Sequence, residues 1–195
     1  MKSVMDNKNI LIIKNSKFIS LLYYLKSKEE FLSKLQEARI LYPNATHYCY
    51  AYIFDNEKKE FDDGEPTGTA GIPILQVLEK NELNHVLCIV VRYFGKIKLG
   101  AGGLVRAYTK STVEVLKNHI VLLETGWFIT LIFPYEQLKQ IDYLLKNTTV
   151  SHKKYESKII YQFSVCNELL EKLEKIDNVT IYRHESVYLL PSNNN

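Results

Sequence analysis

The chain of 195 residues is 46% hydrophobic, which is enough for a buried core and permits one large domain or two small ones. The formal net charge is only +3 at pH 7, so any contact with nucleic acid requires a local cluster of basic residues. Three well-separated cysteines argue against a disulfide framework or a structural zinc site. Since residues 1–8 lack the apolar core of a secretion signal and no apolar run approaches the roughly 20 residues of a membrane span, we expect a cytoplasmic protein without membrane contact.

Hydrophobic periodicity organises the first part of the chain into alternating strands and helices. It predicts four strands, at residues 10–13, 18–25, 46–54 and 86–91. It also predicts three helices, beginning at Ser27, about Ile72 and about Gly102. Ser27 and Glu30 have the spacing of a capping box, and Thr67 or Thr69 is placed to cap the second helix. The charged residues 55–59 are expected to form a turn.

The order of elements changes after Gly126. The pattern predicts strands and helices alternating as β-α-β-β-α-β, at 127–133, 134–146, 149–155, 158–165, 167–176 and 179–189. This is the ferredoxin-like βαββαβ arrangement. We therefore predict an α/β (α+β) protein with a first domain at 1–124, a second at 125–190 and a disordered tail at 191–195.

A basic, glycine-rich loop follows the predicted strand at 86–91. No acidic residue occurs between Glu82 and Glu114, and the basic residues of this interval are Arg92, Lys96, Lys98, Arg106 and Lys110. Glycines leave backbone N–H groups uncovered, and the first turn of a helix carries unpaired donors and a positive dipole end. The candidate anion-binding residues are Arg92, Tyr93, Lys96, Lys98, Gly100, Gly102, Gly103 and Arg106, with Tyr93 as a base-stacking aromatic. The alternative is that the glycines only allow close packing of helix on sheet.

Known phosphate-binding motifs do not fit this loop. Gly95–Gly100 lacks the Gly-Lys-Ser/Thr ending of a P-loop, and Gly100–Gly103 lacks the spacing of a dinucleotide fingerprint. A nucleotide-hydrolysing site is therefore not expected.

A second loop combines acidic residues with glycine and proline. Asp62, Asp63 and Glu65 are candidates for divalent-metal binding, for acid–base chemistry or for ion pairing with Arg92, and such runs are more often solvated surface. We expect this loop and the basic loop to lie side by side and form one cleft. His47 and Cys49 lie two residues apart on one predicted strand, a spacing that permits a nucleophile and its base but is more often structural.

Two long motifs give the chain a family resemblance. Residues 62–71 (DDGEPTGTAG) and 91–108 (VRYFGKIKLGAGGLVRAY), together with His47, Cys49 and Ala51, resemble the IMPACT/YigZ family, formerly an uncharacterised protein family. The resemblance spans nearly the whole chain, because the βαββαβ region is similar to the second domain of the bacterial YigZ-type members. The chain departs from the family pattern at Lys96, where the family usually has a second glycine, and at Thr67, which replaces the commoner serine.

The resemblance implies fold more than activity. It implies a ribosomal protein S5 domain 2-like first domain and a second domain similar to the ferredoxin-like domains of elongation factor G, both common in translation proteins. The eukaryotic relatives are translational regulators that compete for an activator of a kinase acting on an initiation factor, a role that uses an additional N-terminal domain.

Three functional hypotheses stay open at this point. The first is a non-enzymatic, translation-associated regulator that binds RNA or a ribosome-associated protein through the basic loop. The second is a hydrolytic enzyme centred on Asp62, Asp63, Glu65 and Arg92, and the third is a protein–protein regulator without nucleic-acid contact. We assign no catalytic residue, cofactor or metal ligand, place His47, Asp62, Asp63, Glu65, Thr67 and Thr69 in the expected cleft, and leave the oligomeric state undetermined.

Overall fold

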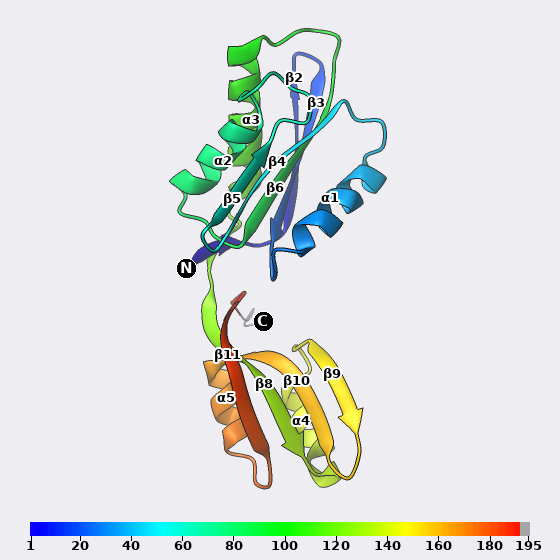
Figure 1. The fold of residues 1–195 in the computed structure, drawn as a ribbon, viewed down its shortest axis with the longest axis vertical. Coiled ribbons are helices and arrows are strands. Elements are labelled where there is room, and N and C mark those ends of the chain that lie inside the picture. Colours follow the sequence, from blue (N-terminus) through cyan, green and yellow to red (C-terminus); the bar gives the residue numbers. More distant parts are fainter. Residues whose placement is uncertain (192–195) are drawn as a thin grey trace. The chain divides into compact units, whose positions relative to one another are not determined.

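The computed structural model describes residues 1–191 and divides the chain into two compact units, Met1–Leu122 and a second that begins at Leu123 (Figure 1). The first unit contains a five-stranded and a two-stranded sheet, the second a four-stranded sheet, and each unit has a hydrophobic core of its own. The expected tail at 191–195 lies outside the described residues except for Pro191. The α+β class and the two-domain layout predicted from the sequence are confirmed.

The first domain is built on a five-stranded antiparallel sheet. Its strands follow the order β2 (Asn7–Ile13), β3 (Ser16–Tyr24), β6 (Val86–Tyr93), β4 (His47–Phe54) and β5 (Glu57–Phe61). A separate two-stranded sheet pairs β1 (Lys2–Val4) with β7 (Ile120–Leu122). The charged residues 55–59 are predicted to form a turn, whereas residues from Glu57 onward belong to strand β5. The charges of EKKEF hide the alternation typical of a half-buried strand, and β5 tolerates them because it lies at the edge of the sheet.

Helices cover both faces of this sheet (Figure 1). Helices α2 (Gly71–Lys80) and α3 (Ala101–Leu116) contribute Ile74, Leu78, Leu104 and Tyr108 to one core cluster. Helix α1 (Glu30–Leu41) packs through Phe31 and Ala38 against the tyrosine-rich opposite face. Because both faces are buried, β6 is apolar along nearly its whole length, and the periodicity of the sequence identifies it readily.

The second domain has the predicted strand and helix order. Its four-stranded antiparallel sheet follows the order β11 (Thr180–Leu189), β8 (Glu124–Phe133), β10 (Ile159–Cys166) and β9 (Val150–Tyr155). Helices α4 (Leu138–Leu144) and α5 (Asn167–Glu174) pack on one face through Ile141, Leu170 and Leu173. Counted within the domain, the strand order is 4-1-3-2, the arrangement of a split βαβ unit.

Two predicted helix starts are wrong in detail. Helix α1 begins at Glu30 and has no side-chain cap, so Ser27 and Glu30 do not form a capping box; the Glu30 carboxylate instead accepts from the backbone N–H of Lys26. Helix α2 has Ala70 at its N-cap position, and the hydroxyl of Thr69 donates to the carbonyl of Pro66. Neither Thr67 nor Thr69 therefore caps α2.

Candidate functional site: two loops joined by a buried ion pair

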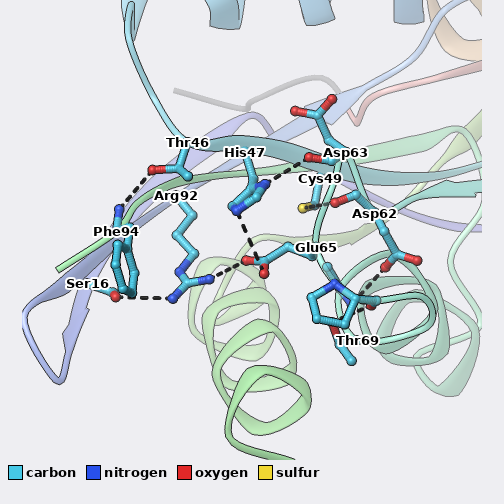
Figure 2. A network of polar contacts seen from close by, with 12 residues as sticks. Ser16, Thr46, His47, Cys49, Asp62, Asp63, Glu65, Thr69, Arg92 and Phe94 are labelled. Carbon is cyan, nitrogen blue, oxygen red and sulfur yellow. Dashed lines mark hydrogen bonds and ion pairs between the residues drawn. The ribbon is translucent and has the colours of Figure 1, made fainter. Parts of the chain in front are cut away.

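The acidic loop and the strand that leads into the basic loop meet at a buried ion pair (Figure 2). Arg92, near the end of β6, places Nη1 at 2.5 Å from Oε1 of Glu65, and the two side chains are only 5% and 3% exposed. The hydroxyl of Tyr108 on α3 donates to the same oxygen at 2.7 Å. The partner of Arg92 is thus Glu65, and neither Asp62 nor Asp63 takes that position.

The guanidinium of Arg92 is held on several sides. Its Nη2 donates to the Ser16 hydroxyl at 3.3 Å, and its carbon lies 5.4 Å and 5.5 Å from the ring centroids of Phe18 and Phe94. Its Nε is buried without a hydrogen-bond partner among the described residues. Because Arg92 is buried and paired, its charge is largely neutralised within the protein, and it fixes the geometry of the loops that surround it.

The Asp62 carboxylate organises the start of α2. One oxygen accepts from the N–H groups of Ala70 and Gly71, at 2.9 and 2.8 Å, and the other from that of Gly68 at 2.8 Å. A carboxylate at this end of a helix satisfies unpaired donors and complements the helix dipole. Asp62 therefore supplies the cap that the sequence had suggested for a threonine.

Asp63 and His47 connect the acidic loop to the neighbouring strand β4. The Asp63 carboxylate accepts from the backbone N–H of Tyr48 at 2.6 Å and lies 3.6 Å from Arg39 on α1. The carbonyl of Asp63 is 2.8 Å from Nδ1 of His47, and since a carbonyl can only accept, Nδ1 carries the proton. The other ring nitrogen, Nε2, then faces the Glu65 carboxylate at 3.8 Å.

Cys49 is not placed to act as a nucleophile. The side chain is buried, and its thiol lies 2.9 Å from the carbonyl of Asp62 and 3.3 Å from the Tyr108 hydroxyl. Burial, and secondarily the nearby carboxylates, raises the pKa of the thiol far above its ordinary value. Burial likewise raises the pKa of Tyr108. His47 and Cys49 both contact the acidic loop, which supports the structural interpretation of their spacing.

The base of the basic loop is fixed in position, and the side chains at its far end are charged and exposed to solvent. At Gly95 an added Cβ would lie 2.0 Å from the carbonyl carbon of Asn15, so the loop rests directly on the β2–β3 turn. Gly100, the N-cap of α3, has φ +71° and ψ 163°, a conformation essentially restricted to glycine. The exposed residues between these two points include Lys96 and Lys98, and Gly102 and Arg106 are exposed on the first turns of α3.

The basic side chains of this loop and of the start of α3 form no ion pair with any other residue that the structure describes. Among residues 1–191, no carboxylate lies within 4.0 Å of Lys96, Lys98, Arg106 or Lys110, and the first turn of α3 contains no acidic residue. The β2–β3 turn and the start of β3 add two exposed lysines, Lys14 and Lys17, next to the base of the loop. Sequence analysis missed these two because they lie about eighty residues away along the chain.

The two aromatic residues at the start of the loop have different roles. Tyr93 is half-buried and its hydroxyl donates to the carbonyl of Pro43 at 3.0 Å, whereas Phe94 is 44% exposed. The residues that sequence analysis did not assign to the site are Ser16, Phe18, Phe94 and Tyr108. Tyr108 and Phe94 lie within the long family motif, so the motif itself was the available signal. Thr67 is exposed and Thr69 buried on the acidic loop.

No three His, Cys, Asp or Glu side chains between residues 1 and 191 are grouped so that they would hold a metal ion. Within the same residues, none of the helices is long and apolar enough to cross a membrane.

The two loops and the strands that carry them coincide with a known domain. The family model for the Impact N-terminal domain matches residues 14–116, which include both loops, His47 and α3. The chain belongs to the IMPACT family.

Individual relatives extend this result. The chain is 47% identical over 117 residues to "IMPACT family member YvyE" of Bacillus subtilis. The aligned residues cover 58% of this chain and 54% of the relative. The chain is 37% identical over 139 residues to "IMPACT family member YigZ" of Escherichia coli, covering 68% of each chain. The matched stretch thus spans about half to two thirds of the length of these curated relatives.

A solved structure matches over both domains. It is a crystal structure of a protein described only as hypothetical, with a TM-score of 0.60 and 26% identity, covering 94% of this chain and 97% of that one. The likeness therefore supports the two-domain α+β architecture as a whole.

Proposed function

We propose that this IMPACT-family protein is a translation-associated regulator that binds RNA, alone or in a ribosome-associated complex, through its basic glycine loop. The observation that carries the proposal is the set of exposed, unpaired basic side chains on one loop and the following helix: Lys96, Lys98 and Arg106. Basic residues without carboxylate partners attract a polyanion, because phosphates release their counterions when such residues neutralise them.

The rigidity of the loop base supports this proposal. Gly95 rests on Asn15, and Arg92 holds the end of β6 through Glu65 and Ser16. A pre-ordered loop loses less conformational entropy on binding than a mobile one. Glycines at the start of α3 add uncovered backbone N–H groups beside the lysines.

The hydrolytic alternative is less consistent with the geometry. The Asp62 carboxylate accepts three backbone hydrogen bonds, and Glu65 is buried between Arg92 and Tyr108. These groups hold the fold together and are not directed at a substrate. The protein-partner alternative remains distinguishable by experiment.

The proposal is tested by the salt dependence of RNA binding. A short single-stranded RNA is titrated with wild-type protein and with the triple variant Lys96→Ala/Lys98→Ala/Arg106→Ala at several salt concentrations. With about three phosphate contacts, the log–log slope for wild type should be roughly −2, and the variant should lose most of it.

A control variant separates local from global charge. Lys80→Ala/Lys139→Ala/Lys175→Ala removes three exposed lysines that lie elsewhere, with the same change in net charge. The control should bind RNA like wild type. If both triple variants weaken binding equally, or if wild type binds no RNA, the basic loop is not an RNA site and the protein-partner hypothesis becomes preferable.

A further inference from the structure

Phe94 is a large aromatic residue that is exposed at the start of the basic loop, directly after β6. Its exposed fraction is 44%, and it precedes Lys96 and Lys98 by two and four residues. A phenylalanine exposed to this extent beside unpaired lysines has a ring available for contact with a ligand.

The backbone around Phe94 is fixed in place. Its N–H donates to the hydroxyl of Thr46 at 3.0 Å, and the next N–H, of Gly95, donates to the hydroxyl of Ser16 at 3.1 Å. Thr46 is itself tied to β6, since its N–H donates to the carbonyl of Arg92 at 2.8 Å. The position of the ring is therefore set by hydrogen bonds from two other segments.

The inner side of the ring is also occupied. The guanidinium carbon of Arg92 lies over the Phe94 ring, 5.5 Å from its centroid, and over the Phe18 ring, 5.4 Å from its centroid. Glu65 and Ser16 hold the guanidinium in that position (Figure 2). Since the guanidinium covers one side of the Phe94 ring, the solvent-exposed part lies on its other side and edge. The buried ion pair thus supports a flat aromatic surface that faces outward.

We infer that the exposed ring of Phe94 stacks against an unpaired base of single-stranded RNA while Lys96 and Lys98 contact the adjoining phosphates. This inference rests on the proposed function and specifies its ligand. Aromatic residues interleaved with basic ones bind single strands, because every base has a π-face and the backbone supplies the charge. Bases in a duplex are already stacked on their neighbours, and a side chain cannot read them in the narrow major groove of RNA.

The experiment compares three probes and two matched variants. Fluorescence anisotropy measures binding of a short oligouridylate, of its duplex with oligoadenylate, and of inorganic polyphosphate. Phe94→Leu removes the aromatic ring and keeps an apolar side chain over Arg92. Phe61→Leu is the control, because Phe61 is also 44% exposed and lies in the same domain, on β5. Thermal denaturation verifies that both variants are folded.

We expect Phe94→Leu to bind the single strand about 5- to 100-fold more weakly, at all salt concentrations and with an unchanged salt slope. Its affinity for polyphosphate should equal that of wild type, and Phe61→Leu should match wild type with every probe. Phe94→Trp should restore or exceed the wild-type affinity for the single strand.

Three results would overturn the inference. If Phe94→Leu binds the single strand like wild type while the lysine variants do not, stacking is wrong and the proposed RNA site stands. If wild type prefers the duplex, the ligand is not a single strand. If wild type binds none of the three probes, the proposed function and this inference both fail.

Discussion

The substitution Glu65→Gln tests whether the buried ion pair organises the first domain. Glu65 and Arg92 have side chains that are 3% and 5% exposed, so water cannot replace the carboxylate when it is removed. Glutamine keeps the shape of the side chain but leaves the Arg92 guanidinium as an uncompensated buried charge. Breaking such a pair from one side costs about 3–5 kcal/mol.

This cost is large enough for a clear measurement. In a domain of this size it corresponds to a decrease in melting temperature of about 10–20 °C. Guanidinium denaturation followed by far-UV circular dichroism gives the free energy of unfolding, and scanning calorimetry gives the melting temperature.

Two further variants show whether burial is the reason. Glu79→Gln breaks an ion pair with Lys58 of similar length, 2.8 Å, whose partners are 40% and 51% exposed, and it should cost less than about 1 kcal/mol. The double variant Glu65→Gln/Arg92→Met removes both buried charges and should recover at least half of the lost stability. The reasoning is refuted if Glu65→Gln is as stable as Glu79→Gln, or if the double variant is less stable than the single one.

Three other predictions follow from contacts in the same domain. Asp62→Ala removes the acceptor of three backbone N–H groups and should lower the free energy of unfolding by about 2–3 kcal/mol. In thermal denaturation, the melting temperature of Asp62→Asn should lie between those of Asp62→Ala and wild type. Gly95→Ala should lower the melting temperature more than Gly100→Ala, because the added Cβ at Gly95 would lie 2.0 Å from Asn15. At Gly100 no atom lies within 4 Å of an added Cβ, so only the strain of the positive φ angle destabilises that variant, by about 1–3 kcal/mol. The reverse order of melting temperatures would contradict the packing at the loop base. Burial raises the pKa of Cys88 from 9.0 to about 12, so the thiol ionises at lower pH in the unfolded chain than in the folded protein. The contribution of Cys88 to stability is therefore complete below pH 9 and is lost as the pH rises to 12. In urea denaturation, Cys88→Ala should lose less free energy of unfolding than wild type over this pH range.

The sequence by itself determined the elements that rest on local patterns. The apolar run of β6 and the βαββαβ order of the second domain follow from the periodicity of hydrophobic residues, because burial against a sheet or helix imposes that period. The two long motifs were sufficient to predict the family, and the absence of acidic residues between Glu82 and Glu114 located the basic loop.

Only the tertiary structure decided which side chains meet. Asp62, Asp63 and Glu65 are near neighbours in sequence with similar chemistry, yet one caps α2, one binds the backbone of β4 and one pairs with Arg92. Positive φ angles at Asp63 (+43°) and Gly64 (+85°) turn the chain between them, and a sequence pattern does not specify the resulting directions. The exposure of Phe94 also depends on contacts from Ser16 and Thr46, which strand pairing brings from distant parts of the chain. Long-range pairing, which local patterns do not encode, therefore set the geometry of the candidate site.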